Sequence, residues 1–148
     1  MPYLQAVVKE TLRLHPPVPL IPRRAESNAE IRGFTIPKHA QVLVNAWAIG
    51  RDGNTWVDPT SFTHGRFLGS EVDFKGRDFE LIPFGAGRRI CPGMPLAKRM
   101  LHLMLASLLH SFAWKFRDGM TPQEMDMSNK VGFTLLKTVP LCAVPVQG

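Results

Sequence analysis

The feature that most constrains the fold of this chain is a proline-rich segment near its start. Four prolines fall within the seven residues from Pro16 to Pro22. Proline has no backbone N–H, fixes φ and disfavours helical backbone at the residue before it, so no helix can continue through this segment. We therefore expect an extended strut that separates a helix before it from strands after it.

The residues before the strut have helical spacing. One stripe recurs at steps of three and four residues, made of Tyr3, Leu4, Val7, Val8, Thr11 and Leu14, which predicts a helix over residues 1–14. Pro2 suits its first turn. The same helix carries Glu10 and Arg13, and spacing alone favours a solvated surface pair worth about a few tenths of a kcal/mol.

The residues after the strut indicate short strands followed by turns. Within residues 31–49, the apolar runs 34–36 and 41–44 flank a Pro-Lys-His turn, which predicts a hairpin. Residues 50–87 are rich in turn-forming pairs, so we expect little regular structure there. A long irregular stretch of this kind inside a compact domain tends to be functional.

A second helix is predicted over residues 95–116. Its apolar face consists of Leu96, Met100, Leu101, Met104, Leu105, Leu108 and Phe112. The most apolar part, residues 100–114, is 15 residues long, whereas a membrane span requires about 20 mostly apolar residues. We therefore expect a buried helix. Two later apolar runs, 133–136 and 141–144, predict a terminal hairpin.

Charge and cysteine content leave some function classes open and argue against others. The chain has 148 residues, 45% of them hydrophobic, which is enough to bury a core. Its net charge of +6 and pI of about 9.8 permit nucleic acid, an anionic membrane surface or an acidic protein as partner. Cys91 and Cys142 form no C-x-x-C pair, which argues against a zinc ribbon, a redox dithiol and a disulfide scaffold. The N-terminus has no signal-peptide pattern.

Cys91 lies in a glycine-rich loop directly before the second helix, beside Arg88 and Arg89. Cationic neighbours and a helix N-terminus both favour a thiolate over a thiol. These residues therefore suggest an activated or metal-ligating cysteine. Three other interpretations stay open on the same residues: a glycine-rich turn, an anion site, or a buried and inert cysteine. Neither common phosphate-loop spacing is present.

The pattern Phe84-x-x-Gly87-x-Arg89-x-Cys91-x-Gly93 resembles the haem-ligand signature of the cytochrome P450 monooxygenases, with all its defining positions present. The resemblance implies that Cys91 is the axial thiolate of the iron of haem b, and no other catalytic group is expected in this chain. It also implies that Arg89 pairs with a haem propionate and that Phe84 packs beside the ligand. Gly87 and Gly93 would allow the tight turn.

The first helix is similar to the E-x-x-R helix of the same family. There the pair joins an arginine from the later irregular segment, the meander, and locks the core behind the haem. The resemblance implies a triad of Glu10, Arg13 and Arg66. This chain has His64 and Gly65 where the family usually has Pro and Glu, which predicts a meander loosened by about 1 kcal/mol through backbone entropy.

The resemblance also suggests further contacts to the haem and to a substrate. Arg23 and Arg24 fall where the family supplies a second propionate contact, with a solvated basic pair as the alternative. The substrate-pocket candidates are Val18, Leu20, Phe133 and Thr134. Packing in the core explains the apolar residues among them equally well.

The resemblance spans residues 1–148 and implies a mainly helical fold with small β-hairpins, the C-terminal part of a single cytochrome P450 domain. Family members are much longer, so we expect the membrane anchor and the oxygen-activating helix to be absent and this chain alone to be inactive. Residues 33–37 and 73–84 are similar to plant microsomal enzymes of the geraniol hydroxylase type.

For the full-length family, the resemblance implies hydroxylation of a small terpenoid or phenolic compound at the cytosolic face of the endoplasmic reticulum. The electrons would come from NADPH-cytochrome P450 reductase. Arg88, Lys98 and Arg99 are candidates for a basic face toward that partner, with a solvated face as the alternative. Two other classes remain: a truncated chain that binds haem weakly or not at all, and a basic interaction module, which lacks a helix-turn-helix, RNP or zinc-finger pattern.

Overall fold

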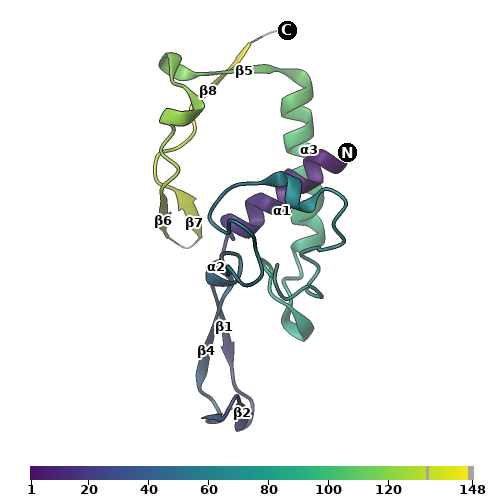
Figure 1. Ribbon diagram of the computed structural model, residues 1–148, viewed down its shortest axis with the longest axis vertical. Helices are drawn as coiled ribbons and strands as arrows, with labels where there is room; N and C mark the ends of the chain where they lie inside the picture. Colours follow the sequence, from purple (N-terminus) through teal and green to yellow (C-terminus); the bar gives the residue numbers. More distant parts are fainter. Residues whose placement is uncertain (133, 147–148) are drawn as a thin grey trace.

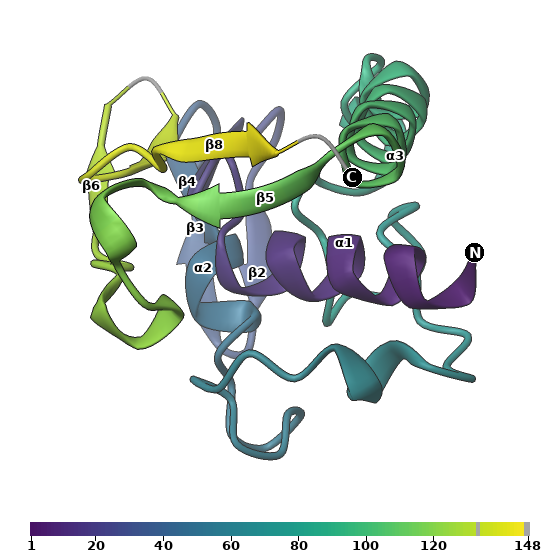
Figure 2. The ribbon, with the colours of Figure 1, turned by 90° about the horizontal axis from the view of Figure 1, so that it is seen from above.

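The computed structural model describes residues 1–132 and 134–146. Its centre is formed by two long helices, α1 (Pro2–Leu14) and α3 (Met94–Ser111). Figure 1 shows α1 crossing behind the loops at the centre, with α3 to one side and a long hairpin extending away from both. In the view along the long axis, α1 lies beneath the ladder formed by β5 and β8 (Figure 2). Part of the irregular segment, residues 50–87, thus lies against α1 at the edge of the molecule (Figures 1 and 2).

The first helix begins and ends where the positions of the prolines predict. Pro2 occupies its first turn, and the helix stops at His15, directly before Pro16. Its buried face consists of Ala6, Val8, Glu10, Leu12, Arg13 and Leu14. The predicted stripe is therefore only partly correct, because Tyr3 and Thr11 are exposed. The irregular segment wraps a different face of α1 from the one that apolar spacing indicates.

The predicted hairpin across residues 37–39 is wrong. β3 (Phe34–Ile36) pairs with β2 (Ala29–Ile31), and β4 (Gln41–Asn45) pairs with β1 (Leu20–Arg24), both antiparallel. The cause is a tight turn at Arg32 and Gly33, which have φ of 49° and 82°, as a two-residue hairpin turn requires. The end of the proline-rich strut is thus a strand and not a free extended segment.

A short helix, α2 (Ala46–Ile49), follows β4 where strand character was expected. Its N-cap is Asn45, whose side-chain oxygen accepts a hydrogen bond from the Ala48 N–H at 2.9 Å. An N-cap of this kind satisfies one of the free donors of the first turn. The cap explains why the chain leaves the strand at this point.

The prediction of little regular structure over residues 50–87 is confirmed. Among the described residues of this segment there is one complete 3₁₀ helix, His64–Phe67, and a second 3₁₀ helix, Gly87–Arg89, begins at its end. This segment supplies much of the core. Trp56, Phe67, Phe74 and Leu81 pack in one cluster with Ala6, Val8 and Leu12 of α1. The irregular segment is therefore held by buried aromatic side chains and not by backbone ladders.

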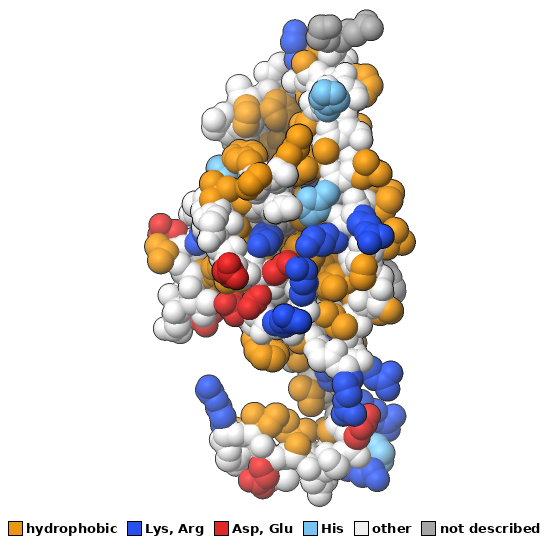
Figure 3. Space-filling view, turned by 90° about the vertical axis from the view of Figure 1, so that its right-hand side faces the viewer, with side chains coloured by type: hydrophobic (Ala, Val, Ile, Leu, Met, Phe, Trp, Pro, Cys, Tyr) orange, Lys and Arg blue, Asp and Glu red, His pale blue; other side chains and the backbone are white. Residues whose placement is uncertain are grey.

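The second helix differs from its prediction in length and in burial. It ends at Ser111, and the following residues form β5 (Ala113–Phe116), which pairs with β8 (Ala143–Val146). None of its residues is buried, and Leu96 is 66% exposed, so the expectation of a buried helix is wrong. Figure 3 shows apolar side chains spread over this side of the molecule, with Lys and Arg side chains across its middle. Among the described residues, no helix is long and apolar enough to cross a membrane.

The predicted terminal hairpin is also wrong. β7 (Leu135–Lys137) pairs with β6 (Asn129–Val131), while β8 returns to β5. Two further 3₁₀ helices, Arg117–Gly119 and Pro122–Glu124, connect β5 to β6. The residues before the first apolar run thus contain a strand of their own, because Asn129–Val131 provides the partner that Leu135–Lys137 requires.

Candidate functional site

The cysteine loop, residues 84–93, folds back on itself before α3. The Cys91 N–H donates to the Phe84 carbonyl at 3.0 Å, and the Ile90 N–H donates to the Gly87 carbonyl at 3.1 Å. The Met94 N–H donates to the Cys91 carbonyl at 3.2 Å, which joins the loop to the helix. These bonds hold Cys91, which is half-buried, between Phe84 and the first turn of α3.

The glycines of this loop differ in backbone conformation and in the space that a side chain would have. Gly87 has a φ of 67°, so it adopts the left-handed backbone that glycine favours. Gly93 is in ordinary helical backbone, and a Cβ there would lie 3.7 Å from the Cys91 Sγ. Its predicted role in the turn is therefore not required by the backbone. Sequence reasoning missed Gly85, which has a φ of 76° and whose added Cβ would lie 2.8 Å from the Arg23 Nη2.

A basic hollow of about 560 Å³ lies next to the cysteine loop. Its lining includes Arg23, Arg24, His39 and Arg89, together with one acidic residue, Glu26. Arg23 is half-buried and donates from Nη2 to the Arg89 carbonyl at 3.3 Å, whereas Arg24 is exposed. The structure thus brings all three predicted arginines to one hollow, with Arg23 directly on the loop. Such a group of guanidinium donors is suited to binding carboxylates.

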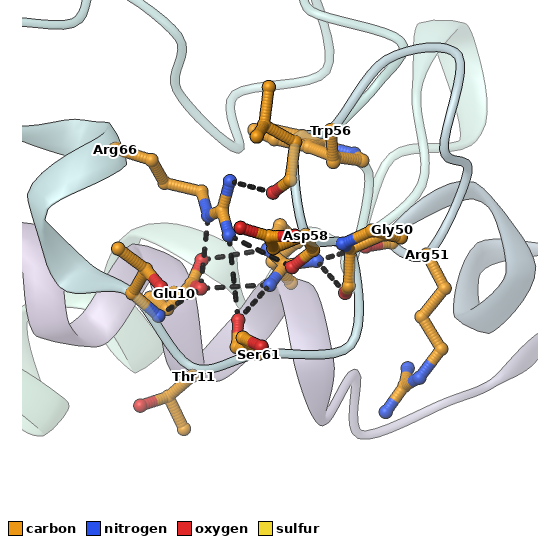
Figure 4. Close-up of polar contacts among 12 residues, drawn as sticks. Glu10, Thr11, Gly50, Arg51, Trp56, Asp58, Ser61 and Arg66 are labelled. Atoms are coloured by element: carbon orange, nitrogen blue, oxygen red, sulfur yellow. Dashed lines mark hydrogen bonds and ion pairs between the residues drawn. The ribbon is translucent and has the colours of Figure 1, made fainter.

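Glu10 lies at the centre of a second polar cluster (Figure 4). Its carboxylate accepts from the Arg13 Nε at 2.7 Å and the Arg13 Nη2 at 2.8 Å. It also accepts from the Arg66 Nε at 3.1 Å and from the Thr63 N–H at 2.7 Å. The structure therefore brings Glu10, Arg13 and Arg66 together, although they come from α1 and from the 3₁₀ helix His64–Phe67.

The interpretation of Glu10 and Arg13 as a solvated pair is wrong, because they are 0% and 1% exposed. Arg13 explains the burial: its guanidinium also donates to the carbonyls of Gly50, Pro59 and Ser61. These carbonyls belong to residues far along the chain, so helical spacing could not reveal them. The sequence feature that could have indicated these contacts is the Glu10-x-x-Arg13 pair followed by the long irregular segment.

The hydrogen bonds to Glu10 outweigh the cost of its burial. Burial alone would raise the pKa of Glu10, but the bonds from Arg13, from the Thr63 N–H and from Arg66 lower the pKa of this carboxyl below its ordinary value. A paired, charged carboxylate in the interior is stable only with such donors. The cluster is therefore an ion-pair network that fastens α1 to the meander.

Arg66 ties the meander to itself as well as to Glu10. It donates to the carbonyls of Val57 at 2.8 Å and Asp58 at 3.3 Å. The two residues before Arg66 make other contacts. The His64 ring packs edge-on against the Tyr3 ring, with 4.6 Å between the ring centroids. At Gly65 an added Cβ would have nothing within 4 Å.

Replacing Gly65 with Ala is expected to stabilise the chain by about 0.5 kcal/mol, because alanine restricts the unfolded chain more than glycine does. The position offers open space, and its φ lies outside the positive range. Urea titration of the free energy of unfolding measures the effect. Gly69→Ala is the control, since its φ of 73° opposes a side chain and should make the change destabilising. A destabilised Gly65→Ala would show that the meander needs glycine here.

Two of the predicted substrate-pocket residues, Val18 and Leu20, are not part of a packed core. Val18 and Leu20 are both exposed, which removes core packing as their explanation. The Leu135 N–H donates to the Pro17 carbonyl at 2.8 Å, so the backbone after Thr134 lies beside the strut. Thr134 is half-buried, and Phe133 lies outside the described residues. The two candidate stretches therefore approach each other through this bond.

Comparison with known proteins assigns these features to one family. The cytochrome P450 family model matches residues 1–141. The chain is 62% identical over 148 residues to cytochrome P450 76T24 of Catharanthus roseus, covering 99% of this chain and 30% of the relative. It is also 62% identical over 146 residues to geraniol 8-hydroxylase of the same plant, covering 98% of this chain and 30% of that enzyme. The chain thus spans about three tenths of the length of these curated relatives.

A solved structure shows the same fold. The chain matches a zebrafish cytochrome P450 determined with abiraterone, with a TM-score of 0.85 and 30% identity, over 99% of this chain and 33% of the other. The expected fold class, helices with small antiparallel ladders as in part of that fold, is confirmed, and so is the similarity to geraniol hydroxylases.

Proposed function

The chain belongs to the cytochrome P450 family, and from this premise we propose that residues 1–148 form part of a single haem-binding domain and supply the thiolate side of a monooxygenase site. The observation that carries the proposal is the placement of Cys91. Its loop is closed by the Cys91 N–H bond to the Phe84 carbonyl and lies beside the arginine hollow. A sulfur ligand and carboxylate-binding groups thus occur together.

The family implies a haem cofactor, and the residues present fit one. Among the described residues, no group of three or more His, Cys, Asp or Glu side chains could hold a metal ion. Cys91 would therefore be a single sulfur donor, which suits a metal whose other ligands come from a macrocycle. The hollow next to the loop presents guanidinium groups, and haem b carries two propionates that such groups bind. We propose haem b as the group held here.

Each residue then has a defined task. Cys91 would hold the haem iron through its sulfur. Arg89 and Arg23 would bind the propionates, with Arg24 at the exposed edge of the same hollow. Phe84 would pack beside the ligand and keep its backbone in place through the 3.0 Å bond to the Cys91 N–H. Gly87 would let the loop turn without a side chain, and Gly93 would leave room beside the sulfur.

The haem group, when bound through a thiolate, supplies the chemistry of oxygen activation, and the protein supplies binding and orientation. We propose that the whole protein carries out RH + O2 + two electrons + two protons giving ROH + H2O. The name of geraniol 8-hydroxylase supports a small terpenoid alcohol as RH, and a phenolic compound is the alternative. Val18, Leu20 and the segment around Thr134 are the pocket residues that we propose in this chain.

The family implies oxygen and a redox partner, and we propose NADPH-cytochrome P450 reductase at the cytosolic face of the endoplasmic reticulum. The exposed side chains of Arg88 and Arg99 support an acidic partner surface. Lys98 is less available, because its Nζ lies 3.7 Å from the Asp73 carboxylate.

A second candidate is that these residues by themselves bind haem weakly or not at all and catalyse nothing. The observation that favours it is α3, which follows the cysteine directly and has no buried residue. An apolar helix left in water is a poor support for a ligand loop.

The reduced, CO-bound absorption spectrum of the purified chain with added haem tests the proposal. We expect a thiolate-type Soret band that disappears in Cys91→Ala and persists in Cys142→Ala, the control at the exposed free cysteine. A band that survives in Cys91→Ala would refute the ligand assignment. Absence of haem uptake by the unmodified chain would contradict the proposal and support the second candidate.

A further inference from the structure

The cysteine loop rests on a short turn, residues 73–78, whose role the proposed function leaves open. The turn is braced by its own carboxylates. The Asp73 N–H donates to the Asp78 carboxylate at 2.8 Å, and the Phe74 N–H donates to the Asp73 carboxylate at 2.8 Å. These bonds fix the backbone of the turn before any contact with the loop is considered.

The turn contacts the cysteine loop at two points. Phe74 is 1% exposed, and its ring packs at 57° to the Phe84 ring with 5.7 Å between centroids. Gly76 lies against Ile90, since a Cβ added there would be 2.8 Å from the Ile90 Cδ1 and 3.2 Å from the Ala86 Cα. The Phe84 carbonyl accepts a hydrogen bond from the Cys91 N–H, and Ile90 directly precedes Cys91. Both contacts therefore act on residues that set the backbone of the cysteine.

The turn is also fastened to α3, the helix that begins three residues after the cysteine. The Lys98 Nζ lies 3.7 Å from the Asp73 Oδ2 and 5.4 Å from the centroid of the Phe74 ring. Burial alone would raise the pKa of Asp73, but Lys75 and Lys98 lower the pKa of this carboxyl below its ordinary value. One lysine thus joins the helix to the turn at its carboxylate and at its ring.

We propose that the turn of residues 73–78 positions the Cys91 sulfur, with Phe74, Gly76 and Lys98 as the positioning residues. The ligand role of Cys91 rests on the proposed function. The positioning itself rests on three contacts, which hold the loop from Phe84, from Ile90 and from α3. A side chain at Gly76 would turn the Ile90 side chain aside and press on the loop backbone at the Ala86 Cα and the Gly85 carbonyl oxygen, both 3.2 Å from the added Cβ, so the loop would shift.

Gly76→Ala and Gly69→Ala form a matched pair for the test. Both glycines have a positive φ, 79° and 73°, so alanine meets similar backbone strain at each. Only Gly76 lies against the cysteine loop, because an added Cβ at Gly69 has nothing within 4 Å. In the reduced, CO-bound spectrum we expect Gly76→Ala to lose most of its thiolate-type Soret band per bound haem. Gly69→Ala should keep that band even where its stability falls.

A measurement without haem uses the second cysteine as an internal reference. Iodoacetamide labels Cys91 and Cys142 in the same molecule, and peptide mass spectrometry gives the two rates. Cys91 is half-buried and Cys142 is exposed, so a displaced loop should raise the rate at Cys91 several-fold and leave Cys142 unchanged. We expect this rise in Gly76→Ala and a smaller rise in Lys98→Gln. Adding Ile90→Val to Gly76→Ala removes the Cδ1 atom and should lower the rate again.

The outcomes separate this inference from the proposed function. Equal Cys91 labelling in Gly76→Ala and Gly69→Ala, with equal thiolate bands, would overturn the positioning role while the ligand assignment stood. If the unmodified chain takes up no haem but the labelling rates still separate the two variants, the proposed function fails and the positioning of the Cys91 sulfur stands. If Gly76→Ala does not fold, Lys98→Gln provides the test. A Cys91 labelling rate in Lys98→Gln equal to that of the unmodified chain would overturn the inference.

Discussion

Glu10→Gln is expected to remove a large part of the stability of the chain. The substitution keeps the size of the side chain but removes the only carboxylate seen to pair with Arg13 and Arg66 among the described residues. Arg13 would then be a charge with 0% side-chain exposure and no counter-charge. Breaking a buried pair in this way costs about 3 to 5 kcal/mol, and a whole domain of ordinary stability has about 5 to 15 kcal/mol.

The free energy of unfolding, measured by urea titration, checks this expectation. Glu71→Gln is the matched control at an exposed position and should change the free energy of unfolding by less than about 0.5 kcal/mol. Arg66→Gln should cost less than Glu10→Gln, because the Arg66 side chain is 12% exposed and Glu10 keeps its bidentate bond to Arg13. A Glu10→Gln variant as stable as the control would show that the network does not hold the fold.

The same network also predicts how the stability of the chain depends on pH. Because the pKa of Glu10 in the folded chain lies below its ordinary value of 4.5, the folded state binds this proton less readily than the unfolded state. The contribution of Glu10 is therefore complete above about pH 4.5 and is lost as the pH falls further. The unmodified chain should lose stability over that range more steeply than Glu10→Gln does. Parallel acid profiles of the two chains would contradict the assignment.

The sequence could predict the cysteine loop and not the network, for a physical reason. The residues that close the loop, Phe84 and Cys91, are seven positions apart, and the pattern between them is local. The donors and acceptors around Arg13 lie at Gly50, Pro59 and Ser61, and no periodicity links them to α1. Only the family resemblance brought Arg66 to this helix in advance.

Strand pairing failed for a related reason. The apolar runs 34–36 and 41–44 each fit a strand with either neighbour, so the sequence pattern cannot choose the partner. The left-handed backbone at Arg32 and Gly33 makes that choice by closing β2 onto β3. Likewise, the spacing of apolar residues in α3 predicts an apolar face but not what covers it. In this structure most of that face is exposed, and Leu105 is half-buried against the core cluster.

Gly50→Ala is the second substitution with a large expected effect. The helical turn α2 delivers Gly50 against the end of α1, where an added Cβ would collide with the Arg13 carbonyl oxygen and lie 3.2 Å from its carbon. Backbone strain plays no part, because the φ of Gly50 is −66° and suits any residue.

The collision in Gly50→Ala is with backbone and not with a flexible side chain, so α2 must move away from α1. That movement also withdraws the Gly50 carbonyl from the Arg13 guanidinium, which ties the steric cost to the network around Glu10. We expect a loss of about 3 kcal/mol in the free energy of unfolding. Gly53→Ala, three residues later and with nothing within 4 Å of an added Cβ, should be close to neutral. Equal stability of the two variants would mean that α2 does not press on α1, and the close approach of Gly50 to Arg13 would lose its structural role.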